Sequence, residues 1–481
     1  MKQFMKEHHI TILLFICTLA YFFYQHATHL SWDFIVYVLN AQYLVNQSTF
    51  FEILRPPLMS LLLIIFNITT WKIAEYVYII FATALFFYAA NTFSKTMNIN
   101  RVIFLIACLT PYFFMYAMIN GTEILTLALM LLFLSHLMKK SFYAGLFLGL
   151  ATLARYNVII FLPLLLFIKK GKDIITSIAI FILTWIPWLI YNYTTTGNML
   201  TSLADNYLLN IKLRDYYFQA TSLAHAELLL ITTIPFILLG FVTLKKELRN
   251  KEHWIMILIA AIILFQYATT ASKEARYLFI VIIPVAFYTA KGIQILPQKI
   301  TKIMCIIFVV INILLLSMIT LTPINKESFN EAITTLEGHH RTHCRLFSNA
   351  WPLLTYLHIP AEQFPRKEQV QKRLAQGDDI LLFFNQREPE WMNDNKFINT
   401  LSTIQQTDTF MLLGTQQHCN EKQPQNKSYT QKLKEDIKEI YNYEINTNPC
   451  FTLFETYVLA ERVCNFMNGN GWQQDKNRVQ H

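Results

Sequence analysis

The stretch "FYAGLFLGLATLARYNVIIFLPLLLFI", residues 142–168, places an arginine in the middle of an apolar run of 27 residues. As one helix it would be about 40 Å long at ~1.5 Å per residue, whereas the hydrocarbon core of a bilayer is about 30 Å thick. A single span would also hold Arg155 near the membrane centre, at a cost of about 2.5–3.5 kcal/mol. We therefore expect two half-length helices, 142–154 and 157–168, with Arg155 facing a polar cavity reached from the outer side.

The rest of the chain has the composition of an integral membrane protein. Apolar residues make up 54% of its 481 residues and charged residues only 15%, which is far from the balance of a soluble domain. Through Leu321 there are 23 Lys and Arg against 12 Asp and Glu, whereas the remaining 160 residues have 17 against 19. We therefore expect a basic transmembrane domain, 1–321, a near-neutral soluble domain, 322–466, and a disordered tail, 467–481.

Basic residues set the expected orientation, because Lys and Arg are enriched in the cytoplasmic loops of membrane proteins. The apolar run 10–23 ends without a small-residue cleavage site and is predicted to be an uncleaved signal anchor. All later basic clusters lie inside if 142–168 doubles back and if Pro56–Trp71 stays shallow at the outer interface. These clusters are Lys95 and Arg101; Lys139 and Lys140; Lys169, Lys170 and Lys172; Lys245, Lys246, Arg249 and Lys251; and Lys291, Lys299 and Lys302.

This orientation predicts a polytopic α-helical fold of about eleven membrane helices. The N-terminus is then cytoplasmic and the C-terminal domain is outside. The helices are expected near residues 10–25, 73–93, 102–118, 122–138, 142–154, 157–168, 174–191, 227–244, 253–270, 276–290 and 303–321.

The C-terminal domain is predicted to be a small α/β domain. Strands are expected at "CRLFSN" (344–349), "DDILLFFN" (378–385) and "FMLLGT" (410–415), and helices at 350–358 and 429–443. Its four cysteines predict two disulfides on an oxidising side of the membrane, with three pairings open and four free thiols as the alternative. These cysteines are Cys344, Cys419, Cys450 and Cys464. The expected location is a bacterial inner membrane, with this domain in the periplasm.

Ionisable residues at the outer ends of membrane helices are functional candidates. Asp33 lies in the first external loop, 26–72, and begins a helical pattern that carries Tyr37 on the same face. Its alternative role is that of a first-turn acid stabilised by the helix dipole. The other candidates on this side are Glu52, Arg55, Glu123, Arg155, Lys273, Glu274 and Arg276.

Several stretches, in this order, resemble the GT-C superfamily of polytopic membrane glycosyltransferases. After the acid of the first external loop come "FEILRPPL" (51–58), "INGTEILTLALMLLFLS" (119–135), "LATLARYNVIIFLPLLLF" (150–167) and "SKEARYLFIVIIPV" (272–285). The resemblance covers residues 1–321 and is to the protein mannosyltransferase and aminoarabinose transferase branches, although Ser272 stands where mannosyltransferase-like branches often have His. It implies an enzyme that takes a sugar from a polyprenyl phosphate at the outer face. The segment "FSNAWPLLTYL" (347–357) similarly resembles external domains that cover the acceptor side of bacterial members.

The resemblance implies that Asp33 is the catalytic base. A polyprenyl phosphate is already a good leaving group, so the reaction needs a carboxylate for the acceptor proton and cations for the growing phosphate charge. Arg276 and Lys273, joined by Arg155 and Arg55, are predicted to bind the donor phosphate, since the planar guanidinium can hold two oxygens. Glu274 is expected to orient the basic groups beside it. Tyr37, Glu52 and Glu123 are predicted to bind the acceptor, with helix capping as the alternative for Glu123.

No cofactor is firmly implied. Asp33, Glu52 and Glu123 could together hold a divalent cation, but no His or Cys spacing on the outer face supports a metal site. The expected function is inverting transfer of a hexose or pentose to a hydroxyl of a glycan, lipid or protein, with membrane lipids and no nucleic acid as further partners. The alternatives are an O-antigen ligase or polymerase, which would have a large late external loop, and a transporter, which would have repeated halves with broken helices.

Overall fold

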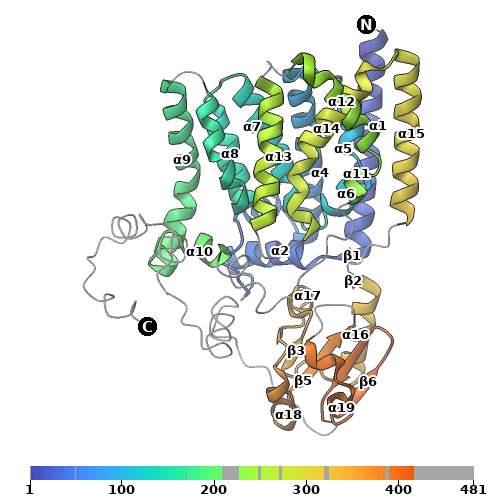
Figure 1. Ribbon diagram of the computed structural model, residues 1–481. Helices are drawn as coiled ribbons and strands as arrows, with labels where there is room; N and C mark the ends of the chain where they lie inside the picture. The colour runs from blue at the N-terminus through green and yellow to red at the C-terminus, as the bar shows by residue number, and fades with distance from the viewer. Residues whose placement is uncertain are drawn as a thin grey trace. The chain divides into compact units, whose positions relative to one another are not determined.

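The computed structural model describes residues 2–48, 50–168, 171–207, 227–247, 251–269, 274–318, 324–384 and 389–415 (Figure 1). The chain divides into two compact units. Of the described residues, unit 1 comprises those in 2–19 and 52–318, and unit 2 comprises those in 20–51 and 324–415.

Unit 1 is helical throughout its described residues (Figure 1). Its first helix, α1, continues into unit 2. The helices are α1 (Lys2–Thr28), α3 (Leu58–Phe66), α4 (Trp71–Thr96), α5 (Arg101–Cys108), α6 (Pro111–Tyr116), α7 (Thr122–Met138), α8 (Tyr143–Ala154), η1 (Tyr156–Phe167), α9 (Gly171–Thr196), α10 (Thr201–Tyr207), α11 (Glu227–Leu230), α12 (Ile234–Glu247), α13 (Lys251–Thr269), η4 (Ala275–Val281), α14 (Ile282–Ile295) and α15 (Gln298–Met318).

Within the described ranges, six helical segments are long and apolar enough to cross a membrane. They are His9–Thr28, Trp71–Thr96, Gly171–Thr196, Lys251–Ala268, Ala275–Ile295 and Gln298–Met318. Three shorter apolar helices, α7, α8 and η1, accompany them. The fold is therefore that of a multi-pass membrane protein, and the larger count of about eleven spans stays a prediction.

The run 142–168 is broken at Arg155, as its length and charge predict. The helix α8 ends at Ala154 and the 3₁₀ helix η1 begins at Tyr156, with Arg155 in an extended conformation between them (φ −150°, ψ 115°). Each piece has 12 residues, which makes them about 18 Å and about 24 Å long, too short to cross a bilayer core of about 30 Å. Gly145 allows α8 to pack closely on α9, since a Cβ there would lie 1.9 Å from the Ser177 carbonyl oxygen.

The segment after the double proline is also short. The helix α3 has nine residues, or about 14 Å, which is half the thickness of the bilayer core. It packs against α4 and α8. Its length fits the prediction that Pro56–Trp71 does not cross the membrane.

Two helices that the sequence predicts as continuous, 102–118 and 227–244, are interrupted, so those two predictions were wrong. The segment 102–118 breaks between α5 and α6, because Pro111 has no N–H to continue the helix and the Thr110 hydroxyl caps the new start by accepting from the Phe113 N–H at 3.4 Å. The segment 227–244 is divided by a turn at 231–233. The predicted span 276–290, by contrast, lies within one apolar helical segment, Ala275–Ile295, whose first turns are the 3₁₀ helix η4 and whose remainder is α14.

Unit 2 contains a five-stranded mixed sheet in the order β4-β3-β5-β7-β6. The strand β3 (Leu346–Ser348) runs parallel to β4 (Ala361–Gln363) and β5 (Asp379–Phe383), and β7 (Phe410–Leu413) runs antiparallel to β5 and β6 (Thr403–Gln406). Its helices are α16 (Lys326–Gly338), α17 (Trp351–Tyr356), α18 (Lys367–Ala375), η5 (Glu390–Asn393) and α19 (Asn395–Ile398). The strands β3, β5 and β7 lie within the segments predicted as strands, because their consecutive residues are buried.

The short strands β4 and β6 were not predicted. They lie at the two edges of the sheet and are only partly buried, so neither has a run of apolar residues. The predicted helix 429–443 lies outside the described residues. Cys344 is buried and disulfide-bonded, whereas Cys419, Cys450 and Cys464 lie outside the described residues, so the pairing stays a prediction.

The same unit contains the segment that follows the first span. The helix α2 (Trp32–Leu44) comes directly after β1 (His29–Leu30), which pairs antiparallel with β2 (Ile324–Asn325). The residues Asp33 through Ala41 of α2 are all buried.

Candidate functional site

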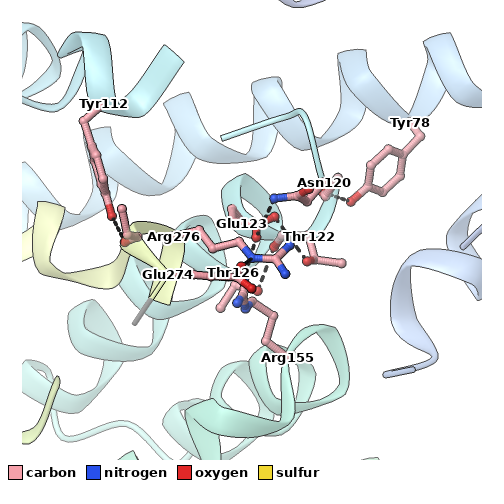
Figure 2. A network of polar contacts seen from close by, with 11 residues as sticks. Tyr78, Tyr112, Asn120, Thr122, Glu123, Thr126, Arg155, Glu274 and Arg276 are labelled. Atoms are coloured by element: carbon pink, nitrogen blue, oxygen red, sulfur yellow. Dashed lines mark hydrogen bonds and ion pairs between the residues drawn. The ribbon is translucent and has the colours of Figure 1, made fainter. Parts of the chain in front are cut away.

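A polar cluster lies in unit 1 at the start of α7 (Figure 2). The turn before this helix contains Gly121 at φ 84°, a backbone conformation that residues with a Cβ rarely adopt. The buried hydroxyl of Tyr78 donates to the Gly121 carbonyl at 2.6 Å and so holds the turn. The helix starts at Thr122, and its second residue, Glu123, enters the cluster.

Glu123 is the buried acid of this cluster. Its Oε1 accepts from the Asn120 Nδ2 at 3.3 Å and from the Arg155 Nη1, and its Oε2 accepts from the Thr122 hydroxyl at 3.3 Å. The Glu123 side chain is 1% exposed and that of Arg155 is 15% exposed. An unpaired carboxylate is costly to bury, so the ion pair with Arg155 explains how the Glu123 carboxylate is tolerated in the interior.

Arg155 reaches Glu123 because the chain leaves the helix at this residue. Its backbone between α8 and η1 is extended, and its side chain donates to Glu123 of α7. The break that the sequence predicts therefore has a specific product, which is a guanidinium beside the start of α7 (Figure 2).

The 3₁₀ helix η4 brings a second arginine. The Arg276 Nε donates to the Glu274 Oε2, and the two side chains are 18% and 14% exposed. The Arg276 guanidinium also lies 5.6 Å from the ring centroid of Tyr277. Figure 2 shows the side chains of Glu274 and Arg276 gathered beside Glu123 and Arg155. Glu274 thus orients the basic group beside it, as the sequence predicts.

A buried tyrosine holds η4 in place. The hydroxyl of Tyr112, which is fully buried, donates to the Ala275 carbonyl at 2.5 Å. Ala275 directly precedes Arg276. Tyr78 and Tyr112 therefore fix the two backbone segments that present Glu123 and Arg276 (Figure 2).

Sequence reasoning missed Tyr78 and Tyr112, and it also missed Asn120 as a partner of Glu123. A buried tyrosine hydroxyl needs a hydrogen-bond partner, but the partner here is a backbone carbonyl 43 or 163 residues away. No local pattern in the sequence indicates such a pair.

A further arginine pairs with an acid in the loop before α3. The Arg55 Nε donates to the Glu52 Oε2 at 2.7 Å, with side chains 17% and 2% exposed. The neighbouring Leu54 carbonyl accepts from the Asn206 Nδ2 of α10 at 3.0 Å. The structure thus joins Glu52 to Arg55, and it joins Glu123 to Arg155, with Arg276 beside the latter pair.

The three arginines share one geometry. Each donates from one nitrogen to a carboxylate that is more deeply buried than itself. A guanidinium is planar and has five N–H donors, and the ion pair with a carboxylate fixes the plane of the group. The cation is clearly the more exposed partner for Arg55 and Arg155 and slightly so for Arg276. This arrangement suits binding of an anion such as phosphate.

The remaining predicted site residues belong to other parts of the chain. Asp33 and Tyr37 are in α2 of unit 2, where they are 7% and 4% exposed. Asp33 is in the first turn of α2, which is also its place in the alternative interpretation. Lys273 lies outside the described residues.

The described ranges contain no group of three or more His, Cys, Asp or Glu side chains that could hold a metal ion. Two of the three acids named for a divalent site, Glu52 and Glu123, are instead bound by Arg55 and Arg155. The cluster is therefore organised around ion pairs.

Comparisons with known proteins show what the chain resembles in sequence and in fold. The family model of Glycosyltransferase family 87 matches residues 54–289. This range contains every arginine and glutamate of the three ion pairs apart from Glu52, which lies just before it. The fold is similar to the crystal structure of ArnT from Cupriavidus metallidurans bound to undecaprenyl phosphate, with a TM-score of 0.53 and 10% sequence identity. That match covers 86% of this chain and 98% of the other chain.

No curated protein sequence matches the chain. The family match and the shared fold nevertheless confirm the resemblance to the GT-C superfamily. The chain therefore resembles membrane glycosyltransferases of the GT-C type: residues 54–289 carry the sequence pattern of glycosyltransferase family 87, and the fold is similar to that of ArnT.

Proposed function

We propose that this protein is an inverting glycosyltransferase that moves one sugar from a polyprenyl-phosphate donor to a hydroxyl of a glycan, lipid or protein. The observation that carries the proposal is the cluster of Arg155, Arg276 and Glu123, set among apolar helices in the region that matches the family. A donor of this class combines a phosphate with a long apolar chain. The cluster offers guanidinium groups for the first, and the exposed apolar helix surfaces suit the second.

The similar fold supports this class of donor. The ArnT structure contains undecaprenyl phosphate, which is a polyprenyl phosphate. The arginines of this chain have the chemistry that such a ligand requires, because a planar guanidinium can donate two N–H bonds to one phosphate. Arg155 and Arg276 are therefore assigned to the donor phosphate, with Arg55 and Lys273 as further contacts.

In the proposed reaction, the acceptor oxygen attacks the anomeric carbon on the side opposite the phosphate. The bond between that carbon and the phosphate oxygen breaks, and the configuration at the carbon inverts. The Asp33 carboxylate takes the proton of the acceptor hydroxyl, and the arginines stabilise the polyprenyl phosphate that leaves. Tyr37, Glu52 and Glu123 are assigned to the acceptor side.

The family match favours glycosyl transfer over the two alternatives, a ligase or polymerase and a transporter. The proposed location is a bacterial inner membrane, with the N-terminus in the cytoplasm and the C-terminal domain in the periplasm. An acceptor outside the cytoplasm follows from this orientation, because both the arginine cluster and Asp33 are assigned to the outer side.

The test is a transfer assay with purified protein, polyprenyl-phosphate sugars and a panel of hydroxyl acceptors. We expect Asp33→Asn to lower kcat by about 100-fold or more, because general base catalysis contributes roughly 10²–10⁴-fold. Donor binding should stay at the wild-type level. Asp205→Asn is the matched control, since Asp205 is a buried acid of α10, 4% exposed, with no proposed role. Equal rates for Asp33→Asn and wild type would reject Asp33 as the base.

A further inference from the structure

The helix that carries Asp33 belongs to the same compact unit as the C-terminal sheet. The segment Ala20–Phe51 groups with Thr320–Ser428, although about 270 residues of membrane helices separate them in sequence. Two sets of contacts join the two segments. The first lies before α2, and the second involves residues at the start of α2 and after its end.

The first set lies where the chain leaves α1. The strands β1 and β2 pair through His29 with Asn325 and through Leu30 with Ile324. The next residue, Lys326, donates from its Nζ to the His26 carbonyl at 2.8 Å. A cation bonded to a carbonyl of the last helical turn stabilises that helix end. The start of the C-terminal segment thus fixes the point from which α2 departs.

The second set is centred on Trp351 of α17. Its ring lies 6.0 Å from the Trp32 ring in an edge-to-face arrangement at 84°, and 5.0 Å from the Phe50 ring. Trp32 immediately precedes Asp33, and Phe50 follows the end of α2. Trp351 is 4% exposed. One indole of the C-terminal domain therefore contacts the chain on both flanks of the helix.

Trp351 is itself held to the sheet. Two residues before it, the side chain of Asn349 forms two hydrogen bonds with the backbone of Phe383 in β5. Its Nδ2 donates to the Phe383 carbonyl at 2.8 Å, and its Oδ1 accepts from the Phe383 N–H at 2.9 Å. The Ala350 N–H donates to the Ser348 hydroxyl at 3.0 Å. The turn between β3 and α17 is thus fixed by buried bonds, and α17 can transmit the position of the sheet to α2.

The start of α2 has an N-cap residue whose side chain does not cap the helix. The residue before the helix, Ser31, has the extended backbone of a helix cap but forms no side-chain cap hydrogen bond. Packing of Trp351 on Trp32 and Phe50 therefore contributes to the orientation of α2. Asp33 lies one residue beyond Trp32, so a change in that packing changes the direction of its carboxylate.

We propose that Trp351 is a positioning residue for Asp33: by packing between Trp32 and Phe50 it sets the orientation of α2 and, through it, the carboxylate. The inference deepens the proposed function, because it rests on Asp33 as the base. A reacting group displaced by about 1 Å can lose roughly 100-fold in rate. The C-terminal domain thereby contributes to catalysis without touching the reacting atoms.

An experiment that does not need activity tests the geometry. In a chain with Asp33→Cys, the rate of thiol labelling is measured with and without Trp351→Leu, and the chain without the introduced Cys supplies the background. We expect Trp351→Leu to speed labelling roughly tenfold, since the helix loosens locally. Trp391→Leu is the matched control, because Trp391 is a buried tryptophan of the same unit, 5% exposed, that donates to the Pro365 carbonyl at 3.2 Å in a separate core cluster. Unchanged labelling with Trp351→Leu, or an equal increase with Trp391→Leu, would overturn the proposal.

A second measurement connects the geometry to transfer in chains that retain Asp33. The fraction of protein that can bind the lipid is measured with undecaprenyl phosphate. The value of kcat is then expressed per binding-competent protein, so that misfolded protein does not contribute. We expect Trp351→Leu to lower kcat about 10- to 100-fold with an unchanged donor KM, and Trp351→Phe to recover most of the loss. Faster labelling with unchanged kcat would overturn Asp33 as the base and the role of Trp351 in the reaction. Absence of transfer by the wild type would instead reject the proposed function, while labelling would still decide the packing.

Discussion

Glu123 and Arg155 form an ion pair in which the buried acid holds a partly exposed guanidinium in place. Burial of the Glu123 carboxylate to 1% exposure requires a cation, and Arg155 supplies it from the break between α8 and η1. The arginine remains 15% exposed. The pair therefore combines a structural role for the acid with an accessible guanidinium, and the two roles can be separated by mutation.

We expect Arg155→Met to lower the free energy of unfolding by about 3–5 kcal/mol, because it leaves a buried carboxylate without a counterion. The double variant Arg155→Met with Glu123→Gln should recover most of that stability, since no buried charge remains. It should still bind undecaprenyl phosphate poorly. Thermal unfolding in detergent measures the first effect and lipid binding the second. If the double variant binds the lipid as the wild type does, Arg155 has only a structural role.

Tyr112 supports the second arginine through the backbone. Tyr112→Phe removes the hydrogen bond to the Ala275 carbonyl next to Arg276. We expect donor binding to weaken about five- to tenfold, which corresponds to the loss of roughly 1 kcal/mol from one hydrogen bond. The control is Tyr288→Phe in α14, whose hydroxyl contacts the His253 carbonyl at 3.5 Å. Equal losses in the two variants would show that Tyr112 acts only through general stability.

At the scale of elements, interruption of helices creates the polar cluster. The break at Arg155, the Gly121 turn before α7 and the 3₁₀ helix η4 each release a charged or polar side chain from a regular apolar helix. In a membrane, irregular backbone is tolerated only where it is buried in protein or lines a polar cavity. The coincidence of three such interruptions in one cluster follows from this requirement.

The sheet of unit 2 contains a titratable element of its own. Asp379 begins β5, is fully buried, and accepts from the Arg341 Nη1 at 2.6 Å. Burial raises the pKa of Asp379 from 3.8 to about 6, against the opposing effect of Arg341. The folded chain then binds more protons than the unfolded chain between these two values, so this group favours folding at low pH and loses that contribution as the pH rises through 6.

We therefore expect the unfolding free energy of unit 2 to fall as the pH is raised from about 4 to 6, and this contribution to level off above 7. Asp379→Asn cannot titrate and should remove that slope. Thermal unfolding followed by tryptophan fluorescence between these pH values compares the two proteins. Parallel pH profiles would show that Asp379 does not control the slope.

At the scale of the whole molecule, the assigned groups are divided between two units. Arg155 and Arg276 belong to unit 1, whereas Asp33 belongs to unit 2 together with the C-terminal sheet. The proposed reaction needs both, so donor binding and proton removal can be impaired independently. Donor affinity therefore reports on the assigned residues of unit 1, whereas kcat also depends on Asp33 in unit 2.

The proposed orientation predicts which surfaces reagents reach in intact cells. A membrane-impermeant maleimide should label Glu368→Cys, an exposed position of α18, without permeabilisation of the inner membrane. It should label Lys139→Cys, an exposed position after α7, only after permeabilisation. Spheroplasts remove other barriers for both variants. The reverse pattern would place the C-terminal domain in the cytoplasm.

The sequence predicted those parts of the fold and site that depend on the free-energy cost of burying a charge within a short apolar segment. A charged residue in the middle of a long apolar run predicts the break at Arg155, because no single helix of that length avoids burying the charge. The acids and arginines near helix ends were recognised for the same reason. The break at Pro111 and the edge strands β4 and β6 were missed, since a cap at Thr110 and a place at the edge of a sheet leave weak local patterns.

By itself, the sequence determined a membrane protein with half-length helices, its charged candidates and a likeness to polyprenyl-phosphate glycosyltransferases, because hydrophobic length and charge placement act within short segments. Only the tertiary structure decided which acid pairs with which arginine, that Tyr78 and Tyr112 hold the two loops of the cluster, and that the Asp33 helix packs with the C-terminal domain through Trp351. Those contacts join residues tens to hundreds of positions apart. Their partners are chosen by burial and by the need of every buried polar group for a bond, which no single segment of the chain specifies.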